Sequence, residues 1–207
     1  MTPPIIRADA PGALPEAVRL LRADHLIVVP TDTVYGVAAH GLREAAVAKL
    51  YDAKLRPRDK AIPLLLAGPG DVEQVGIGIG DLARELMERY WPGPLSVVIP
   101  ARPDLPPSLT AGGKTVAVRI PDCDVTRALI RALGAPLAAT SANLSGDSPA
   151  LTAHDAADML GDAVALALDN GRSPGGEAST VVDATVSPPR VLRPGPLTID
   201  PDLVRRP

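Results

Sequence analysis

The feature that most constrains the fold is a series of short apolar runs, four or five residues long, that alternate with amphipathic segments. The runs at 26–29, 62–66 and 95–99 predict buried strands, and the helical spacing of apolar residues at 13–23 and 43–53 predicts helices. Further strands are predicted at 114–121, 137–139, 164–168, 181–183 and 190–193, and further helices at 81–90, after 124 and at 152–160, with Asp81, Asp124 and Thr152 as N-caps. The irregular alternation predicts one α/β domain with a mixed sheet over residues 1–207, with a core at about 10–197.

Charge and cysteine content exclude several classes of protein. The net charge of −3 argues against a domain that coats nucleic acid, because such domains are strongly basic. The single cysteine, Cys123, excludes an intrachain disulfide and a cysteine zinc site. The apolar runs are too short for a membrane span, and the N-terminus lacks the pattern of a signal peptide. We therefore expect a soluble cytoplasmic protein without membrane contact.

One basic stretch, at residues 54–60, stands out from this acidic background. It contains Lys54, Arg56, Arg58 and Lys60, although the whole chain has only four lysines. Pro57 disfavours helix for the residue before it, so the stretch lies at the end of the helix at 43–53. Such a cluster is either a site for a polyanion or a solvated loop whose cations favour a helix C-terminus, and the stretch alone leaves both interpretations open.

Polar clusters recur where short apolar runs end. They lie at 31–33, 54–60, 140–145 and 179–180, and they are joined by two arginines on apolar strands, Arg119 and Arg193. Arg119 stands between Val118 and Ile120, so it either pairs with a carboxylate or faces a polar cavity. Hydroxyls, amides and cations together suit a ligand that carries phosphate and carboxylate groups.

The chain shows no pattern of a protein nucleophile with its base. Its three histidines, His25, His40 and His154, have no partner motif, and we interpret them as structural or surface residues. Cys123 is interpreted as a small apolar filler. Phosphoryl and nucleotidyl transfer remain open, because they depend on positioning and on charge stabilisation more than on a nucleophile from the protein.

Seven motifs in order resemble the YrdC-type threonylcarbamoyl-AMP synthase family, over about residues 26–195. They are PTDTVYG (30–36), KLRPRDK (54–60), YWPGPLSVV (90–98), VAVRIP (116–121), TSANLSG (140–146), EASTVVD (177–183) and LRPG (192–195). The resemblance implies a twisted mixed sheet with surrounding helices and a large basic concave cavity. It also implies a nucleotidyltransferase that makes threonylcarbamoyl-AMP and pyrophosphate from L-threonine, bicarbonate or CO2, and ATP accompanied by Mg²⁺.

The same resemblance assigns roles to individual residues. Its signature of cations and amides falls on Lys54, Arg56, Lys60, Ser141 and Asn143, of which Lys54, Arg56 and Lys60 are the expected catalytic residues. The expected contacts to ATP or the adenylate are Arg56, Lys60, Thr115, Ser141, Asn143 and Arg193. The expected contacts to threonine are Thr33, Arg119 and Ser179, with Arg119 on its carboxylate. No metal site within the protein is expected.

The chain departs from the family pattern at a few positions. A histidine that touches threonine in some relatives is replaced by Leu65, and the histidine usual after the Arg-x-Pro motif is replaced by Cys123. Some relatives carry Asn where this chain has Lys60. The family has a further serine beyond the Ser-Gly pair; that position aligns with Pro149 here, although Ser148 lies next to it. Longer relatives add a C-terminal domain, whereas this chain stops at Pro207, so we expect the short form.

Two rival functions remain beside the synthase. The first is a non-catalytic RNA-binding module that uses the basic cavity, against which the net charge and the scarcity of aromatic residues count. The second is a carbamoyl-transfer domain of hydrogenase maturation, whose zinc-finger cysteines are absent here. For the synthase, we expect a functional link to the tRNA threonylcarbamoyl transferase complex and weak tRNA binding. The segments 68–80 and 103–113 are candidate lids on composition alone.

Overall fold

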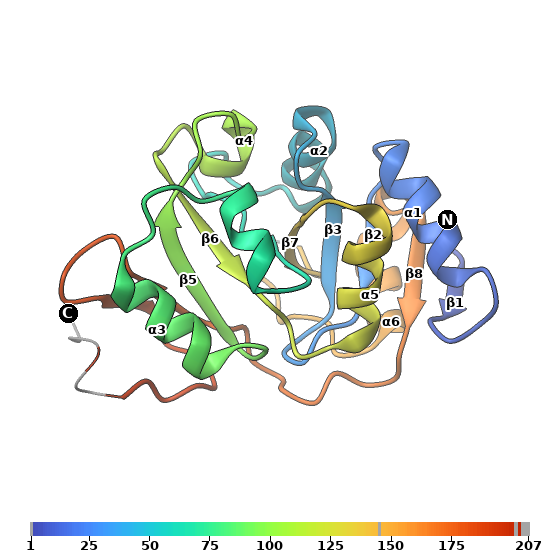
Figure 1. Ribbon diagram of the computed structural model, residues 1–207. Coiled ribbons are helices and arrows are strands. Elements are labelled where there is room, and N and C mark those ends of the chain that lie inside the picture. The colour runs from blue at the N-terminus through green and yellow to red at the C-terminus, as the bar shows by residue number, and fades with distance from the viewer. Residues whose placement is uncertain (1, 145, 201–202, 204–207) are drawn as a thin grey trace.

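A ten-stranded mixed sheet forms the centre of the computed structural model, which describes residues 2–144, 146–200 and 203 (Figure 1). The strand order is β1-β8-β2-β3-β7-β4-β6-β5-β9-β10, with parallel and antiparallel neighbours. The strands are β1 (Ile5–Arg7), β2 (Ile27–Val29), β3 (Gly36–His40), β4 (Leu64–Leu65), β5 (Leu95–Pro100), β6 (Thr115–Arg119), β7 (Leu137–Ser141), β8 (Leu166–Asp169), β9 (Thr180–Asp183) and β10 (Arg190–Arg193). The predicted α/β class with a mixed sheet is confirmed.

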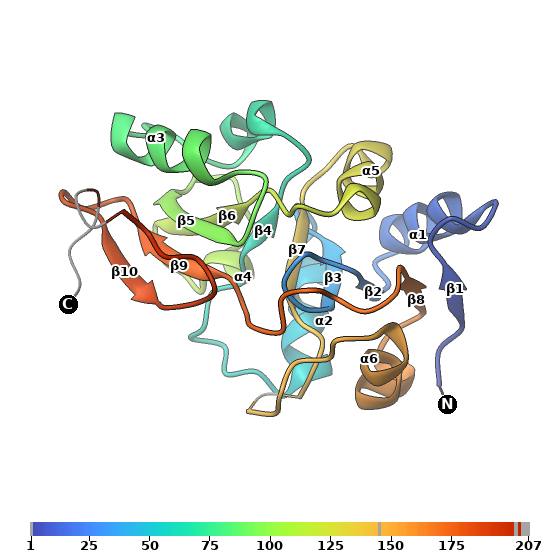
Figure 2. The same cartoon turned by 90° about the horizontal axis from the view of Figure 1, so that it is seen from below.

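Helices cover both faces of this sheet. Figure 2 shows α1, α3 and α5 on one side and α2 and α6 on the other. Their bounds are α1 (Ala13–Arg22), α2 (Glu44–Lys54), α3 (Asp81–Tyr90), α4 (Pro107–Thr110), α5 (Asp124–Leu133) and α6 (Ala153–Leu160), with 3-10 turns at Pro69–Gln74 and Gly161–Ala163. No helix in the described part of the chain is long and apolar enough to cross a membrane.

The alternation of side chains along β2 explains how one short strand serves both layers. Ile27 and Val29 pack into the apolar cluster formed with α1 and α5, whereas Val28 packs into the cluster formed with α2 and α6. Successive residues of a strand point to opposite faces, so a strand covered on both faces is continuously apolar. The uninterrupted run at 26–29 is the sequence signature of this arrangement.

Several boundaries differ from the prediction. Strands β1 and β3 were not predicted, and β1 extends the sheet to Ile5, before the expected start of the core. The expected strand at 62–66 is reduced to two residues in β4, and the expected loop at 103–113 contains α4. The N-caps of α3 and α5 are Gly80 and Cys123, because the expected caps are already the first helical residues. Thr152 is confirmed as a cap, since its hydroxyl accepts from the Asp155 amide.

Two hydroxyl-rich segments meet at one end of the sheet. The 30–35 segment joins the antiparallel strands β2 and β3, and β3 begins opposite the end of β7, with Gly36 paired to Ser141. The Ala142 amide continues this contact by donating to the Tyr35 carbonyl at 2.8 Å. The sheet register therefore places PTDTVYG and TSANLSG side by side. Ser145 of the second motif and the arginines 205 and 206 of the tail lie outside the described residues.

Gly195 offers a test of how tightly the last motif is packed. A Cβ atom at this position would lie 2.5 Å from the Thr180 nitrogen and 2.6 Å from the Ala178 oxygen, both backbone atoms. We expect Gly195→Ala to lower the free energy of unfolding by about 1–3 kcal/mol, as overpacking does. Gly68→Ala is the matched control, because a Cβ atom at that position would have no neighbour within 4 Å and its φ of −165° suits any residue. Equal urea midpoints for the two variants would contradict this packing.

Candidate functional site

A polar cavity of about 170 Å³ opens where the two hydroxyl-rich segments meet strands β5, β6, β9 and β10. Its wall combines three arginines, six hydroxyl residues and six glycine or apolar residues. The lining residues are Thr31, Thr33, Val34, Gly36, Arg56, Pro63, Leu65, Ser96, Arg119, Ala139, Thr140, Ser141, Ala178, Ser179 and Arg193. Cations and hydroxyls from distant parts of the chain thus converge on one space, as an anionic ligand requires.

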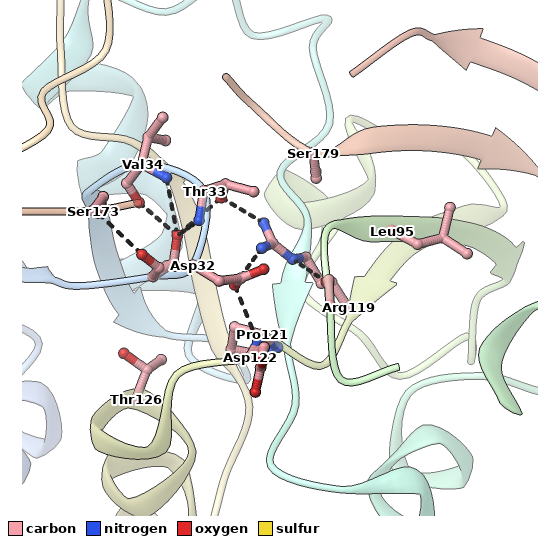
Figure 3. A network of polar contacts seen from close by, with 12 residues as sticks. Asp32, Thr33, Val34, Leu95, Arg119, Pro121, Asp122, Thr126, Ser173 and Ser179 are labelled. Atoms are coloured by element: carbon pink, nitrogen blue, oxygen red, sulfur yellow. Dashed lines mark hydrogen bonds and ion pairs between the residues drawn. The ribbon is translucent and has the colours of Figure 1, made fainter. Parts of the chain in front are cut away.

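Arg119 is the most deeply buried of the three arginines, with 5% of its surface exposed. Its Nη2 donates to Asp32 Oδ1 at 2.5 Å, its Nη1 to Thr33 Oγ1 at 2.9 Å and its Nε to the Gly93 carbonyl at 2.9 Å. Figure 3 shows this guanidinium pointing toward Asp32 and Thr33. Burial lowers the pKa of Arg119, and the Asp32 carboxylate opposes that shift. The sequence predicted that Arg119 either pairs with a carboxylate or faces a polar cavity. In the structure it does both.

Arg193 and two serines form the opposite wall. The Arg193 Nη2 donates to the Ser179 carbonyl at 2.7 Å and to Ser179 Oγ at 3.2 Å, and its Nε also reaches the same carbonyl. Ser179 Oγ lies 2.8 Å from Ser96 Oγ. Burial lowers the pKa of Arg193, and the nearby charge of Arg56 lowers it further. The basic stretch and the last strand therefore meet in space although 137 positions separate these two arginines.

Arg56 enters the cavity from the basic stretch. Its Nε donates to the Lys60 carbonyl at 3.1 Å and its Nη2 to the Ala61 carbonyl at 2.9 Å. Burial lowers its pKa, whereas Asp59 raises it. Two backbone carbonyls thus hold the guanidinium in place without a carboxylate. This arrangement leaves its positive charge directed at the cavity.

Lys54 lies behind the cavity wall. Its Nζ donates to the carbonyls of Ser141 and Asn143 and, at 3.1 Å, to Asn143 Oδ1, with only 2% of the residue exposed. Burial is the main cause that lowers its pKa to about 8, and the charge of Arg56 adds to it. The ammonium group therefore binds the backbone that carries Ser141, and it does not line the space where a ligand would sit.

Six of the ten predicted site residues meet in the cavity and four do not. Thr33, Arg56, Arg119, Ser141, Ser179 and Arg193 line it, whereas Lys54, Lys60, Thr115 and Asn143 lie outside its wall. Lys60 is exposed and Thr115 is half-buried at the start of β6. The Asn143 amide donates to the carbonyls of Leu144 and Asp147, so it holds its own turn.

Sequence reasoning missed other residues of the wall. Ser96 alternates with Leu95 and Val97 on β5, and a single polar residue within an apolar strand was the signal that could have found it. Thr31, Val34 and Thr140 belong to motifs that were recognised, but the sequence does not show which way each points. Leu65, where some relatives carry histidine, lies in the wall and pairs in register with Arg119.

A second hollow, of about 390 Å³, is larger but less suitable for an anion. It lies beside the start of α5 and shares Thr31 with the first cavity. Its wall holds one guanidinium, of Arg172, against the carboxylates of Asp32, Asp122 and Asp124. Of these two cavities, only the smaller one has the excess of cations that an anionic ligand needs. We therefore choose the smaller cavity as the candidate site because of its charge, although its volume is lower.

Comparisons with known proteins place most of the chain in one family. The family model Sua5/YciO/YrdC, described as "Telomere recombination", matches residues 19–195. A Mycobacterium tuberculosis (strain H37Rv) relative is 42% identical over 184 residues, which cover 89% of this chain and 84% of the relative. A Bacillus subtilis relative named threonylcarbamoyl-AMP synthase is 42% identical over 185 residues, covering 88% of this chain and 53% of the relative.

A solved structure extends the comparison to the fold. The crystal structure of Pyrococcus abyssi Sua5 complexed with L-threonine matches with a TM-score of 0.90 and 35% identity. The match covers 95% of this chain and 58% of the Sua5 chain, so the present chain spans little more than half of that protein. The extent of these matches confirms the resemblance carried by the seven motifs: the chain belongs to the Sua5/YciO/YrdC family.

Proposed function

We propose that this chain is an L-threonylcarbamoyladenylate synthase, which forms threonylcarbamoyl-AMP and pyrophosphate from L-threonine, bicarbonate or CO2, and ATP. The observation that carries the proposal is the convergence of Arg56, Arg119 and Arg193 on one hydroxyl-lined cavity. Relatives named for this activity support it. The chain covers about half of some of these relatives, so we assign the activity of the whole protein to this chain only as a proposal.

The two substrates divide the cavity between them. In our proposal Thr33, Arg119 and Ser179 hold threonine, and Arg119 uses its remaining N–H groups on the substrate carboxylate, since three of its five are engaged. Arg56, Arg193 and Ser141 hold the phosphates of ATP. Lys60, Thr115 and Asn143 lie outside the wall, and we retain Lys60 and Thr115 for outer parts of the nucleotide and Asn143 for shaping the turn after Ser141.

The reaction joins two anions, and the site offsets their repulsion. The neutral amine of threonine adds CO2 to give an N-carboxylate, whose oxygen attacks the α-phosphorus of ATP while pyrophosphate leaves. A well-placed donor contributes about 3 kcal/mol to such a transition state. Holding the reactants in line contributes about 7 kcal/mol or more in good cases. Guanidiniums that are already bound to backbone carbonyls supply this charge without reorganisation.

Magnesium enters our proposal as part of the substrate. Mg²⁺ bound to the triphosphate would share the task of neutralising the phosphates and the leaving group. Among the described residues no group of three or more His, Cys, Asp or Glu side chains is placed to hold a metal ion. The cavity wall instead offers guanidiniums and hydroxyls, which suit phosphate oxygens and not the cation itself.

Lys54 acts as a positioning residue in this proposal. Its ammonium group holds the carbonyls of Ser141 and Asn143, so it fixes the backbone that presents Ser141 to the phosphates. The contact crosses from the end of α2 to the end of β7, and it joins the basic stretch to TSANLSG. This positioning role replaces the catalytic role that the family signature suggested for Lys54.

The product would feed a second enzyme. We propose that threonylcarbamoyl-AMP passes, in the cytoplasm, to the tRNA threonylcarbamoyl transferase complex, which modifies adenosine 37 of tRNAs that read codons starting with A. Weak tRNA binding is compatible with the local positive charge. A purely RNA-binding role is the alternative, and its affinity would fall steeply with salt.

Incubation with threonine, bicarbonate and ATP–Mg²⁺ tests the function directly. We expect pyrophosphate release that requires all three substrates, together with the adenylate detected by mass spectrometry. Salt-sensitive RNA binding without pyrophosphate release would favour the RNA-binding alternative. If neither the adenylate nor RNA binding is detected, both functions are contradicted.

Replacing Arg56 tests the phosphate site. We expect Arg56→Ala to reduce pyrophosphate release by about 100-fold or more, the loss typical of a removed charge-stabilising donor. The fold should remain intact, since Arg56 donates only to two loop carbonyls. Arg58→Ala is the matched control, because Arg58 pairs with Asp52 at the surface and does not line the cavity. Unchanged turnover in Arg56→Ala would refute the assignment.

The buried ammonium of Lys54 predicts a pH effect on stability. Its folded-state pKa of about 8 lies below the ordinary value of 10.5, so between these values the unfolded chain binds the proton more tightly. The penalty of burying the charge is therefore present below pH 8 and is relieved as pH rises through 8. Relative to Lys54→Met, the wild-type free energy of unfolding should rise by up to about 1.4 kcal/mol per pH unit. A pH-independent difference in urea titrations between pH 7 and 9 would contradict this.

A further inference from the structure

The charge of the cavity wall is one-sided. Three guanidiniums line it, and none of the fifteen lining residues among the described part of the chain is Asp or Glu. Arg56 and Arg193 form no ion pair with a carboxylate within the described residues, and only Arg119 does so, with Asp32. The wall therefore attracts carboxylate and phosphate, and it offers no counter-ion to a positively charged group.

Asp32, the carboxylate beside the wall, is already occupied. Its Oδ1 accepts from Arg119 Nη2 at 2.5 Å and from the Asp122 amide at 3.1 Å, and only 12% of its side chain is exposed. Figure 3 shows Asp32 between these two partners. Moving it to meet a ligand would leave the Arg119 charge buried without its partner, which is strongly destabilising.

Several other oxygens around the cavity are already engaged in hydrogen bonds. The Ser179 carbonyl accepts two N–H groups of Arg193, and the Gly93 carbonyl accepts Arg119 Nε. Ser96 and Ser179 pair through their hydroxyls. The Thr31 hydroxyl accepts two backbone amides and donates to the Val34 carbonyl. The engaged oxygens lie next to the guanidiniums, so an ammonium group, which donates three hydrogen bonds, finds few free acceptors there.

Threonine in solution carries both a carboxylate and an α-ammonium group, and this wall suits only the first. We propose that the cavity binds threonine with its amine neutral, and that the ammonium proton passes to bulk solvent on binding. The inference rests on the proposed function, because it takes threonine as the ligand. The neutral amine is the form that adds CO2, so the positive field of the wall replaces a general base.

The charged groups at the cavity come from three places in the chain. Arg56 faces it from the loop after α2, Arg119 from β6 and Arg193 from β10, while Lys54 at the end of α2 lies behind the wall. Asp32 acts on Arg119, and Asp59 acts on Arg56 from outside the wall. Of the lysine and arginine side chains in this set, only Lys54 titrates near neutral pH, with a pKa of about 8. Measurements at pH 7 and below, where Lys54 stays largely protonated, therefore report mainly on the substrate.

Calorimetry measures the released proton directly. Threonine is titrated into the wild-type chain at about pH 7 in PIPES and in Tris, whose ionisation enthalpies differ widely. We expect the difference in heat to correspond to about one proton released per threonine bound. Binding without proton release would overturn the proposal. Absence of threonine binding would instead contradict the proposed function, so the two failures are distinguishable.

A matched ligand separates the amine from the rest of threonine. In (2S,3R)-2,3-dihydroxybutanoate a hydroxyl replaces the amine, and the carboxylate and side chain are unchanged. We expect it to bind without proton release and with an affinity independent of pH between 6 and 7. Threonine affinity should rise about tenfold per pH unit over the same range, since the neutral fraction rises tenfold. Equal pH dependence of the two ligands would contradict the inference.

Two arginines on β10 provide matched variants. Arg193 lines the cavity, whereas Arg190 lies at the other end of the strand and does not line it. We expect Arg193→Gln to move the pH at which half a proton is released to a higher value, because the weaker positive field tolerates the ammonium form. Arg190→Gln should leave that pH unchanged. The same half-release pH in all three proteins would show that the guanidiniums of the wall do not cause the effect.

Discussion

The rest of the site depends on keeping like charges together. Three guanidiniums share one small cavity, and Arg56 is close enough to Arg193 to lower its pKa. Each is held by oxygens of the protein: Arg56 by two loop carbonyls, Arg193 by Ser179, and Arg119 by Gly93, Thr33 and Asp32. These contacts offset mutual repulsion before any ligand arrives, and their oxygens belong to the segments that connect the strands and helices. Preorganised charge of this kind is what a reaction between two anions requires.

The regular part of the fold could be predicted from the sequence because burial leaves a local pattern. Runs such as 26–29 are apolar without interruption, since both faces of the sheet are covered. Strand β3 was missed because Gly36–His40 contains glycine, alanine and histidine, which favour strands weakly. Its position between β2 and β7 is set by pairing with both neighbours, and long-range pairing leaves no mark in a local window.

The sequence predicted which arginines belong to the candidate site, but not the direction in which each side chain points. The motifs identified Arg56, Arg119 and Arg193, and the structure brings all three to the cavity. Lys54 and Arg56 are two residues apart, yet one points into the fold and the other into the cavity. Leu55 between them adopts a left-handed conformation with φ of 51°, which ends α2 and turns the chain. A sequence of alternating cations does not encode that turn, because leucine seldom adopts it.

Strand β4 gives the sheet a narrow waist. It has only two residues, and two register pairs join it to β7 on one side and to β6 on the other. The cavity straddles this waist: Thr33 and Ser141 belong to the half with β3 and β7, whereas Ser96 and Ser179 belong to the half with β5 and β9. Few backbone pairs therefore join the two halves of the wall along this line. The contacts from Arg119 to Asp32 and Thr33 cross the same line, so a side-chain network adds to the short strand in holding the two halves of the cavity together.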